Sequence, residues 1–409
     1  MTTSDVAATS GESQVGRLVR ASEVNTRMLA MVGALILIWV IFDLLTQGTF
    51  LTARNLFNLS VQSSVVGIMA TGMVLVIVAR HIDLSVGSVL GFTGMVMAYL
   101  HVEVFPLGSD WGWPLAIILG LTLGALVGLW QGAWIAYGGV PAFVVTLGGL
   151  LIFRGATWLV TTGRTVAPLD PNYQLLGGGI DGSIGAFWSW VLGALAIAAV
   201  VWLAVNARRK RARFGFPLKP MWAEVATVVV AALVIVGFVA VMNAYTKPRT
   251  DIPRGIAVPV LILILVVVVM AFVAKMTKFG RYVFAMGGNP EAAQLSGIHV
   301  RRTTTMIFVI MGVLCAIAGV VQSARLNAGT NSMGTLSELS VIAAAVIGGT
   351  SLAGGVGTIT GAILGAVIMQ SLENGMVLLS VSSAMRMIII GLVLVTAVFL
   401  DVLYNRNRR

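Results

Sequence analysis

The sequence predicts an all-α protein that crosses a membrane many times. Of its 409 residues, 58% are hydrophobic and only 10% are charged. About a quarter of the residues in a typical soluble domain are charged, so these few charges cannot cover a surface that faces water. The apolar runs, such as 28–45 and 256–274, are also continuous, whereas a membrane β-barrel would alternate polar and apolar residues. Helices satisfy their own backbone groups in lipid and therefore fit this pattern.

Apolar segments follow one another along the whole chain, and a membrane crossing needs about 20 such residues. In chain order the expected spans are 28–45, 56–78, 85–101, 114–136, 142–161, 187–206, 223–243, 255–274, 304–324, 337–349, 357–378 and 384–403. The segment 337–349 is too short for a full crossing and is expected to be a half-helix. We therefore expect a polytopic protein with about 10–12 membrane segments, including broken or half helices.

The basic residues predict the orientation of the chain. If the N-terminus is cytoplasmic, 18 Lys and Arg residues fall in inside segments and six in outside loops, which agrees with the positive-inside rule. We expect one membrane domain, residues 28–405, with both ends of the chain in the cytoplasm. The inside segments are a polar tail (1–27), a turn at Arg80, a basic loop (206–222), a second basic loop (275–303) and the basic C-terminus (406–409).

Glycines recur once per helical turn in three of the segments. Such stripes allow the backbone of a neighbouring helix to approach closely. They predict helix packing and do not identify a substrate. The glycines are Gly87 and Gly91, then Gly120, Gly124, Gly128 and Gly132, and finally Gly357, Gly361 and Gly365.

No arrangement of residues predicts catalysis in this chain. The sequence lacks a GxxxxGK[ST] phosphate loop, so we do not expect ATP to bind here. It has one cysteine, Cys315, and three histidines, His81, His101 and His299, scattered in predicted loops, so we expect neither a cofactor nor a metal site. The net charge of +11 lies mainly beside apolar runs, which argues against nucleic-acid binding. Transport or channel function is favoured over enzymology.

Two polar motifs interrupt the apolar pattern, and each has two interpretations. In the motif 80–88, Asp83 or Ser85 can cap the following helix, and nothing in it specifies a ligand. In the motif 348–357, repeated glycines break a helix and free its backbone groups, which is tolerated at membrane depth only where protein or water satisfies them. This second motif marks either a transport path or an ordinary interfacial loop.

A long basic segment, 278–302, is expected outside the membrane. Within it, Asn289 can cap a helix and Pro290 suits the first helical position. Gly297 can end that helix after about two turns. We therefore expect a short helix at 289–297 on the cytoplasmic side, where it would serve as a docking surface for a partner.

Three charged residues, Arg154, Glu373 and Arg386, fall inside predicted spans. A charge at the centre of a membrane helix costs roughly 2.5–3.5 kcal/mol on insertion scales. These side chains are therefore expected to face the protein interior or water. They would act there as a structural ion pair, as snorkelling side chains or as substrate contacts.

Four stretches of the sequence resemble the ribose/xylose/galactoside permeases of bacterial ABC importers. They are 82–88 (IDLSVGS), 140–147 (VPAFVVTL), 287–298 (GGNPEAAQLSGI) and 346–357 (VIGGTSLAGGVG). The resemblance runs from about residue 50 to the end of the chain. It implies a type II ABC importer-like permease in the bacterial inner membrane. It also implies a homodimer, an ATPase with two nucleotide-binding domains that carries the ATP and Mg²⁺, and a periplasmic sugar-binding protein.

The same resemblance implies a cargo and the roles of residues. Segments 206–255 and 327–334 most resemble xylose-type permeases, which implies D-xylose. Segment 289–297 resembles the helix that couples a permease to its ATPase. The coupling residues are then Gly288, Asn289, Glu291, Ala292, Ala293, Ser296 and Gly297. The family provides no sharply defined sugar-binding set, so the polar motifs supply the candidate path residues, Asp83, Ser85, Ser88, Asn327, Asn331, Thr350 and Ser351.

An ion-coupled secondary sugar transporter with 12 helices is the main alternative. Such transporters often carry a basic G-x-x-x-D-R-x-G-R-R loop, which this sequence lacks. A channel or a membrane-embedded enzyme would need a pore ring or a catalytic cluster, and the sequence predicts neither.

Overall fold

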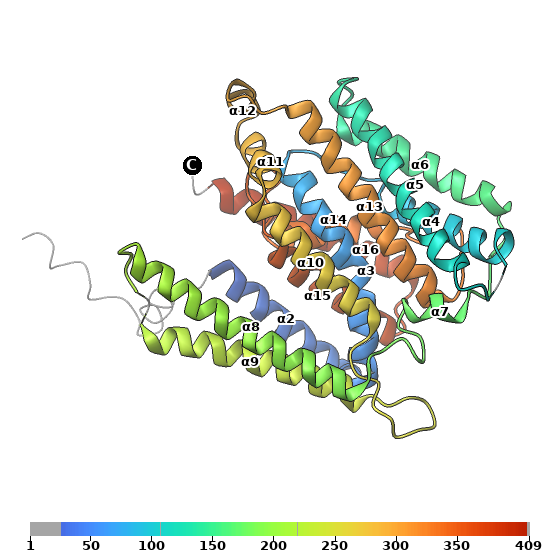
Figure 1. Cartoon of the computed structure of the whole chain (residues 1–409), viewed down its shortest axis with the longest axis horizontal. Coiled ribbons are helices and arrows are strands. Elements are labelled where there is room, and N and C mark those ends of the chain that lie inside the picture. The colour runs from blue at the N-terminus through green and yellow to red at the C-terminus, as the bar shows by residue number, and fades with distance from the viewer. Residues whose placement is uncertain (1–25, 107, 219, 407–409) are drawn as a thin grey trace, which may run out of the picture.

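The computed structural model describes residues 26–106, 108–218 and 220–406, which form helices joined by short connections (Figure 1). Its elements are α2 (Thr26–Leu45), α3 (Ala53–Val78), α4 (Val86–Tyr99), the π-helix η1 (Leu100–Val104), α5 (Gly112–Ala136), α6 (Ala142–Thr161), α7 (Pro171–Leu175), α8 (Gly185–Arg213), α9 (Met221–Ala244), α10 (Val258–Met276), α11 (Lys278–Gly288), α12 (Pro290–Leu295), α13 (Val300–Leu326), α14 (Ser337–Ile347), α15 (Ile359–Leu378) and α16 (Ser383–Arg406). Most of the expected tail, 1–27, and all of the expected C-terminus except Arg406 lie outside the described residues.

The expected membrane segments are present. Ten helices of the described chain are long and apolar enough to cross a membrane, and two shorter apolar helices, α14 and the first part of α16, accompany them. The prediction of an all-α protein with about 10–12 membrane segments is confirmed. The expected half-helix is α14, which has only 11 residues.

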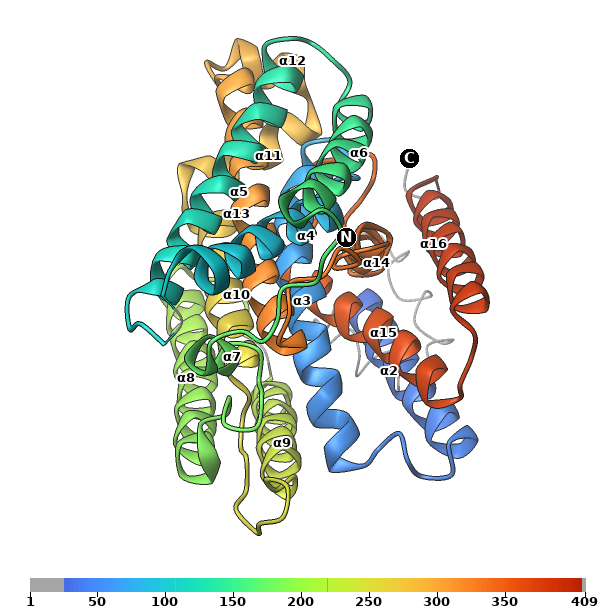
Figure 2. The ribbon, with the colours of Figure 1, turned by 90° about the vertical axis from the view of Figure 1, so that its right-hand side faces the viewer.

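Helix α3 forms the centre of the fold. Every residue from Ser63 to Val78 is buried, because α10, α13, α14 and α15 surround it. Figure 2 shows α3 passing between these helices. The side chains of Met69, Met73, Phe308 and Met311 are buried in one large apolar cluster here. The second half of α3, residues 65–78, is apolar on nearly all sides and suits this central position.

The glycine stripe on α5 allows α5 and α13 to approach very closely. A Cβ atom added at Gly128 would collide with the carbonyl group of Phe308 and lie 2.8 Å from the Cα of Val309. Gly124 and Gly312 face each other at the same interface, and each occupies the space that a Cβ on the other would need. The stripe therefore packs two helices together, as the sequence predicts.

The basic segment 206–222 is more helical than expected. Helix α8 continues through the basic residues as far as Arg213, so the connecting loop spans only 214–220. Arg, Lys and Ala are good helix formers, and cations near a helix C-terminus interact favourably with the helix dipole. These two effects outweigh the polarity that suggests a loop.

Two further differences concern segments that the sequence predicts as loops. His101 lies in the π-helix η1, where its Nδ1 atom is 2.8 Å from the carbonyl oxygen of Met97. Segment 275–303 holds two helices outside the spans, α11 and α12, although one was expected. Thr277 caps the additional helix, since its Oγ1 accepts a hydrogen bond from the backbone N–H of Gly280 at 3.1 Å.

Helices α8 and α9 form a hairpin at the edge of the molecule (Figure 1). Only about a tenth of the most apolar stretch of each helix is buried. The hairpin packs on the body mainly near one end, where Val239 and Met242 join Phe57 in a small apolar cluster. Most of its surface therefore faces lipid.

We expect Gly128→Ala to destabilise the protein by about 1–3 kcal/mol, the cost of overpacking a tight interface. The measurement is the melting temperature of the detergent-purified chain. Gly155→Ala is the matched control, because a Cβ there would meet nothing within 4 Å and both substitutions gain the same helix propensity. Equal melting temperatures for the two variants would contradict the packing described for α5 and α13.

Candidate functional site

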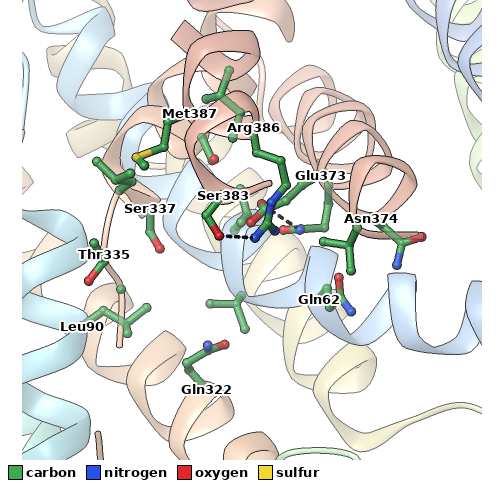
Figure 3. Close-up of a pocket in the computed structure, with 18 of the residues that line it drawn as sticks. Gln62, Leu90, Gln322, Thr335, Ser337, Glu373, Asn374, Ser383, Arg386 and Met387 are labelled. Carbon is green, nitrogen blue, oxygen red and sulfur yellow. Dashed lines mark hydrogen bonds between the residues drawn. The ribbon is translucent and has the colours of Figure 1, made fainter. Parts of the chain in front are cut away.

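A polar cavity of about 540 Å³ lies among α3, α4, α13, α14, α15 and α16 (Figure 3). Its lining combines amide, hydroxyl and charged side chains with a few apolar ones. The polar lining residues are Gln62, Gln322, Arg325, Thr335, Ser337, Ser340, Gln370, Glu373, Asn374, Ser383 and Arg386. So many polar side chains are unusual on apolar helices, because a polar group that faces lipid raises the free energy of the membrane-inserted helix.

The sequence positions these side chains by helical spacing. Gln370, Glu373 and Asn374 are three and four residues apart on α15, so they share one face of the helix. Gln322 and Arg325 share a face of α13 in the same way. The Nδ2 of Asn55 donates a hydrogen bond to the Oδ1 of Asn374 at 2.9 Å, which ties α3 to α15 beside the cavity.

Two of the charged side chains in the cavity are hydrogen-bonded to neutral neighbours. Arg386 donates from Nη2 to the Oγ of Ser383 at 2.9 Å, and Gln370 donates from Nε2 to the Oε2 of Glu373 at 3.0 Å. Figure 3 shows Arg386, Glu373 and Ser383 close together. Many donors and acceptors with few charges suit a neutral solute that carries several hydroxyl groups.

A re-entrant segment, residues 327–336, forms one wall of this cavity. It begins where Asn327 adopts a left-handed conformation at the end of α13, and it leads into the half-helix α14. Arg154 on α6 holds it by donating from Nη1 to the carbonyl oxygens of Asn331, at 3.2 Å, and Met333, at 2.8 Å. The end of this segment, Gly334 to Leu336, lines the cavity together with Ser337, the first residue of α14.

The short helix α12 projects from the body of the protein. Asn289 caps it, since its Oδ1 accepts a hydrogen bond from the backbone N–H of Ala292 at 3.0 Å. Ala293 is buried, whereas Leu295 is 91% exposed. Gly297 ends the helix with a φ of 83°. An exposed large apolar side chain on a short, well-capped helix is suited to contact with another protein.

The residues before α12 are fastened to the end of α3. Arg80 donates from Nε to the carbonyl oxygen of Gly287 and from Nη2 to that of Gly288, both at 2.7 Å. The backbone N–H of Gly355 donates to the carbonyl oxygen of Val78 at 2.9 Å. A Cβ at Gly287 would lie 2.7 Å from the nitrogen of Gly355, so the approach requires glycine. The Gly-rich loop 348–358 therefore lies against both α3 and the base of α12.

The expected coupling residues all lie in or beside α12. Gly288, Asn289, Glu291, Ala292, Ser296 and Gly297 are exposed, and Ala293 is buried. Ser296 donates a hydrogen bond from Oγ to the carbonyl oxygen of Ala292 at 2.8 Å. Six of the seven residues are therefore exposed in α12 or directly beside it.

The structure does not bring the seven candidate path residues into one site, and none of them lines the polar cavity. Asp83 accepts hydrogen bonds from the backbone N–H and the Oγ of Ser85, at 2.8 and 2.7 Å. Gln131 in turn donates to the Oγ of Ser85 at 2.7 Å. Burial raises the pKa of the Asp83 carboxyl, and the hydrogen bonds from Ser85 oppose this shift. These groups form a buried network just before α4, in which Ser85 occupies the N-cap position but makes no capping hydrogen bond with its side chain.

The remaining candidates occupy separate positions. Asn327 accepts a hydrogen bond from the backbone N–H of Leu169 at 2.8 Å. Asn331 lies in the re-entrant segment, where its carbonyl oxygen accepts from Arg154. Ser88, Thr350 and Ser351 are buried. Thr350 and Ser351 belong to the Gly-rich loop that contacts α3.

Sequence reasoning identified Glu373 and Arg386 as intramembrane charges but overlooked the amides of the cavity. Gln62, Gln322, Gln370 and Asn374 are polar residues inside three long apolar runs, and that signal could have marked them. The described residues contain no group of three or more His, Cys, Asp or Glu residues that could hold a metal ion.

Comparisons with known proteins match nearly the whole chain. Residues 55–398 match a family model described as the permease component of branched-chain amino acid transport systems. The chain is 42% identical to the xylose transport system permease protein of Escherichia coli strain K12, over 92% of both chains. It is 40% identical to the protein of that name in Haemophilus influenzae, over 94% of this chain and 98% of the relative. It is 33% identical to the ribose import permease protein of E. coli strain K12, over 91% of this chain and 92% of the relative. No solved structure matches the chain.

Replacing Arg154 should loosen the re-entrant segment. Hydrogen bonds from a charged donor are worth about 1.5–3 kcal/mol each, so Arg154→Met should speed amide hydrogen exchange in residues 327–336 at least about tenfold. Arg164→Met is the control, because Arg164 forms an exposed ion pair with Glu103 at 2.7 Å and such pairs contribute little. Unchanged exchange in the Arg154 variant would show that α6 does not hold this segment.

Proposed function

This chain belongs to the permease-component family that its residues 55–398 match, and from that premise we propose that it is the membrane-spanning permease subunit of an ATP-driven importer of D-xylose. The observation that carries this proposal is the 42% identity to a xylose transport system permease protein over 92% of the chain. The ribose import permease protein is less similar, at 33%, so xylose is favoured over ribose.

The chain supplies the membrane path and is not itself an enzyme. It is a multi-pass inner-membrane protein, and a separate ATPase subunit hydrolyses ATP. A periplasmic binding protein delivers the sugar in importers of this family. The ion-coupled alternative receives no support, because the relatives reported above are named as transport system or import permease proteins.

The polar cavity is proposed as the part of the path that receives the sugar. It lies beside the starts of α3 and α16 and the ends of α13 and α15, which the expected orientation places toward the periplasm. Its amides and hydroxyls match the hydroxyl groups of a monosaccharide, and its charged residues are few. The structure would then correspond to a state that is open toward the periplasm.

Helix α12 is proposed as the helix that engages the ATPase. It lies at the opposite end of the protein from the cavity, on the side that the positive-inside rule assigns to the cytoplasm. Its exposed residues include Glu291 and Leu295, which would contact a groove in the partner. The capping by Asn289 keeps the short helix formed before the partner binds.

The half-helix α14 offers a direct connection between these two regions. Its first residues line the cavity, and the loop after its last residue touches Gly287 and Gly288 at the base of α12. A helix of 11 residues is roughly 16 Å long and moves as a rigid unit. A displacement of α12 by the ATPase would therefore reach the cavity through α14.

A second copy of the permease and cytoplasmic termini complete the proposal. The family resemblance supports the homodimer, and the distribution of Lys and Arg supports the orientation. Measuring the mass of the purified transporter tests the homodimer, because two permease copies are expected for two ATP sites. A thiol probe that cannot cross the membrane tests the second, because a cysteine at Leu218 should react only from the cytoplasmic side.

We expect Leu295→Asp to abolish co-purification of the ATPase and ATP-driven xylose uptake, because it places a charge in an apolar contact. The amount of inserted permease should not change, since Leu295 is exposed. Ile252→Asp is the control for co-purification, because Ile252 is also exposed, at 57%, but lies in the loop between α9 and α10. Normal co-purification by the Leu295 variant would contradict the role of α12.

Gln322→Leu should lower xylose uptake by about tenfold, the effect of one lost hydrogen bond to the sugar. Association with the ATPase should stay normal, which separates this test from the previous one. Thr396→Val is the control, because Thr396 is an exposed polar residue of α16 outside the cavity. If both variants transport xylose at the rate of the unchanged protein, the cavity is not on the path.

A further inference from the structure

The tip of the α8–α9 hairpin, of which the structure describes residues 208–218 and 220–222, takes no part in the function proposed above. Three of its basic side chains, Arg209, Lys210 and Arg213, are exposed. Arg208 forms an ion pair with Glu224 at 2.8 Å. The tip is therefore a concentrated positive surface with a single neighbouring carboxylate among the described residues 206–224.

The length of α8 places these cations at the level of lipid headgroups. The helix has 29 residues and is therefore roughly 44 Å long. The hydrocarbon core of a bilayer is only about 30 Å thick. An upright helix of this length has about nine residues more than the core needs, and the basic residues occupy its last two turns. The cations then lie where phosphate groups are concentrated.

Large apolar side chains surround the same cations. Phe214, Phe216, Met221 and Trp222 are between 50% and 69% exposed. Aromatic side chains favour the interface between lipid tails and headgroups. Cations combined with exposed aromatic residues are typical of surfaces that bind anionic membranes.

Little of the protein supports the tip. The hairpin packs on α3 near its other end, at Phe57, Val239 and Met242. Figure 1 shows the hairpin at one edge of the molecule, separated sideways from α12. An ATPase that engages α12 is therefore a less suitable partner for the tip than the lipid beside it.

We propose that the hairpin tip is a binding site for the headgroups of anionic phospholipids in the cytoplasmic leaflet. The phosphate groups contact Arg209, Lys210 and Arg213, and the aromatic residues insert among the adjacent acyl chains. This contact fixes the free end of the hairpin at the membrane surface. The site rests on the proposed orientation but not on the proposed cargo.

The experiment measures lipid binding to the full-length chain by native mass spectrometry. Purified protein in detergent is titrated with an anionic lipid, phosphatidylglycerol, and with a zwitterionic one, phosphatidylcholine. Arg209→Gln/Arg213→Gln should weaken phosphatidylglycerol binding by roughly thirtyfold, given the usual effect of two charges at an anionic surface. Phosphatidylcholine binding should not change.

Lys247→Gln/Arg249→Gln is the control for charge, because it removes two cations from the loop beyond the other end of the hairpin, one of which is paired with Asp181 at 2.6 Å. The proposal predicts normal phosphatidylglycerol binding for this control and for Arg209→Lys/Arg213→Lys, which keeps the charge. Equal loss in both Gln double variants would overturn it by showing a general charge effect. Unchanged phosphatidylglycerol binding by Arg209→Gln/Arg213→Gln would also overturn the proposal. If this variant lost co-purification of the ATPase but still bound the lipid, the tip would be assigned to a protein partner.

Discussion

The backbone between Asn327 and Thr358 is the constraint on which the rest of the structure depends. Only α14 is helical in this stretch, so many of its N–H and C=O groups must find partners elsewhere at membrane depth. Arg154 supplies two hydrogen bonds to carbonyl oxygens, and Arg27 donates to the carbonyl oxygen of Val346 at 3.2 Å. The charged residue inside α6 is thus explained by the break in the neighbouring chain.

The same break produces the features that support transport. A continuous helix in place of 327–358 would fill the space beside α4 and α16 and would leave no polar cavity. The non-helical stretch after α13 brings residues 334–337 to the cavity wall, and the Gly-rich loop after α14 reaches the base of α12. Close backbone contacts, such as Gly355 with Val78, keep that loop in place. Because close-packed elements transmit strain, this packing would pass a displacement of the loop on to α14.

The sequence predicted the membrane helices well because apolar length is a local property. It also predicted the cap by Asn289 and the end of α12 at Gly297, since both depend on neighbouring residues. The cavity could not be predicted in this way. Gln62, Gln322 and Gln370 lie on three helices far apart in the sequence, and only tertiary packing brings them together. The polar motif at Asp83 was more visible in the sequence, yet Asp83 and Ser85 bond to each other and do not line the cavity.

Transport by purified components is the most direct test of the central claim that this chain is the passive path of an ATP-driven sugar importer. The chain, its ATPase and its binding protein are reconstituted in proteoliposomes, and the entry of labelled xylose is measured. The account predicts uptake only when all three proteins and hydrolysable ATP are present. Uptake by the chain alone, driven by a proton or sodium gradient without ATP, would contradict it.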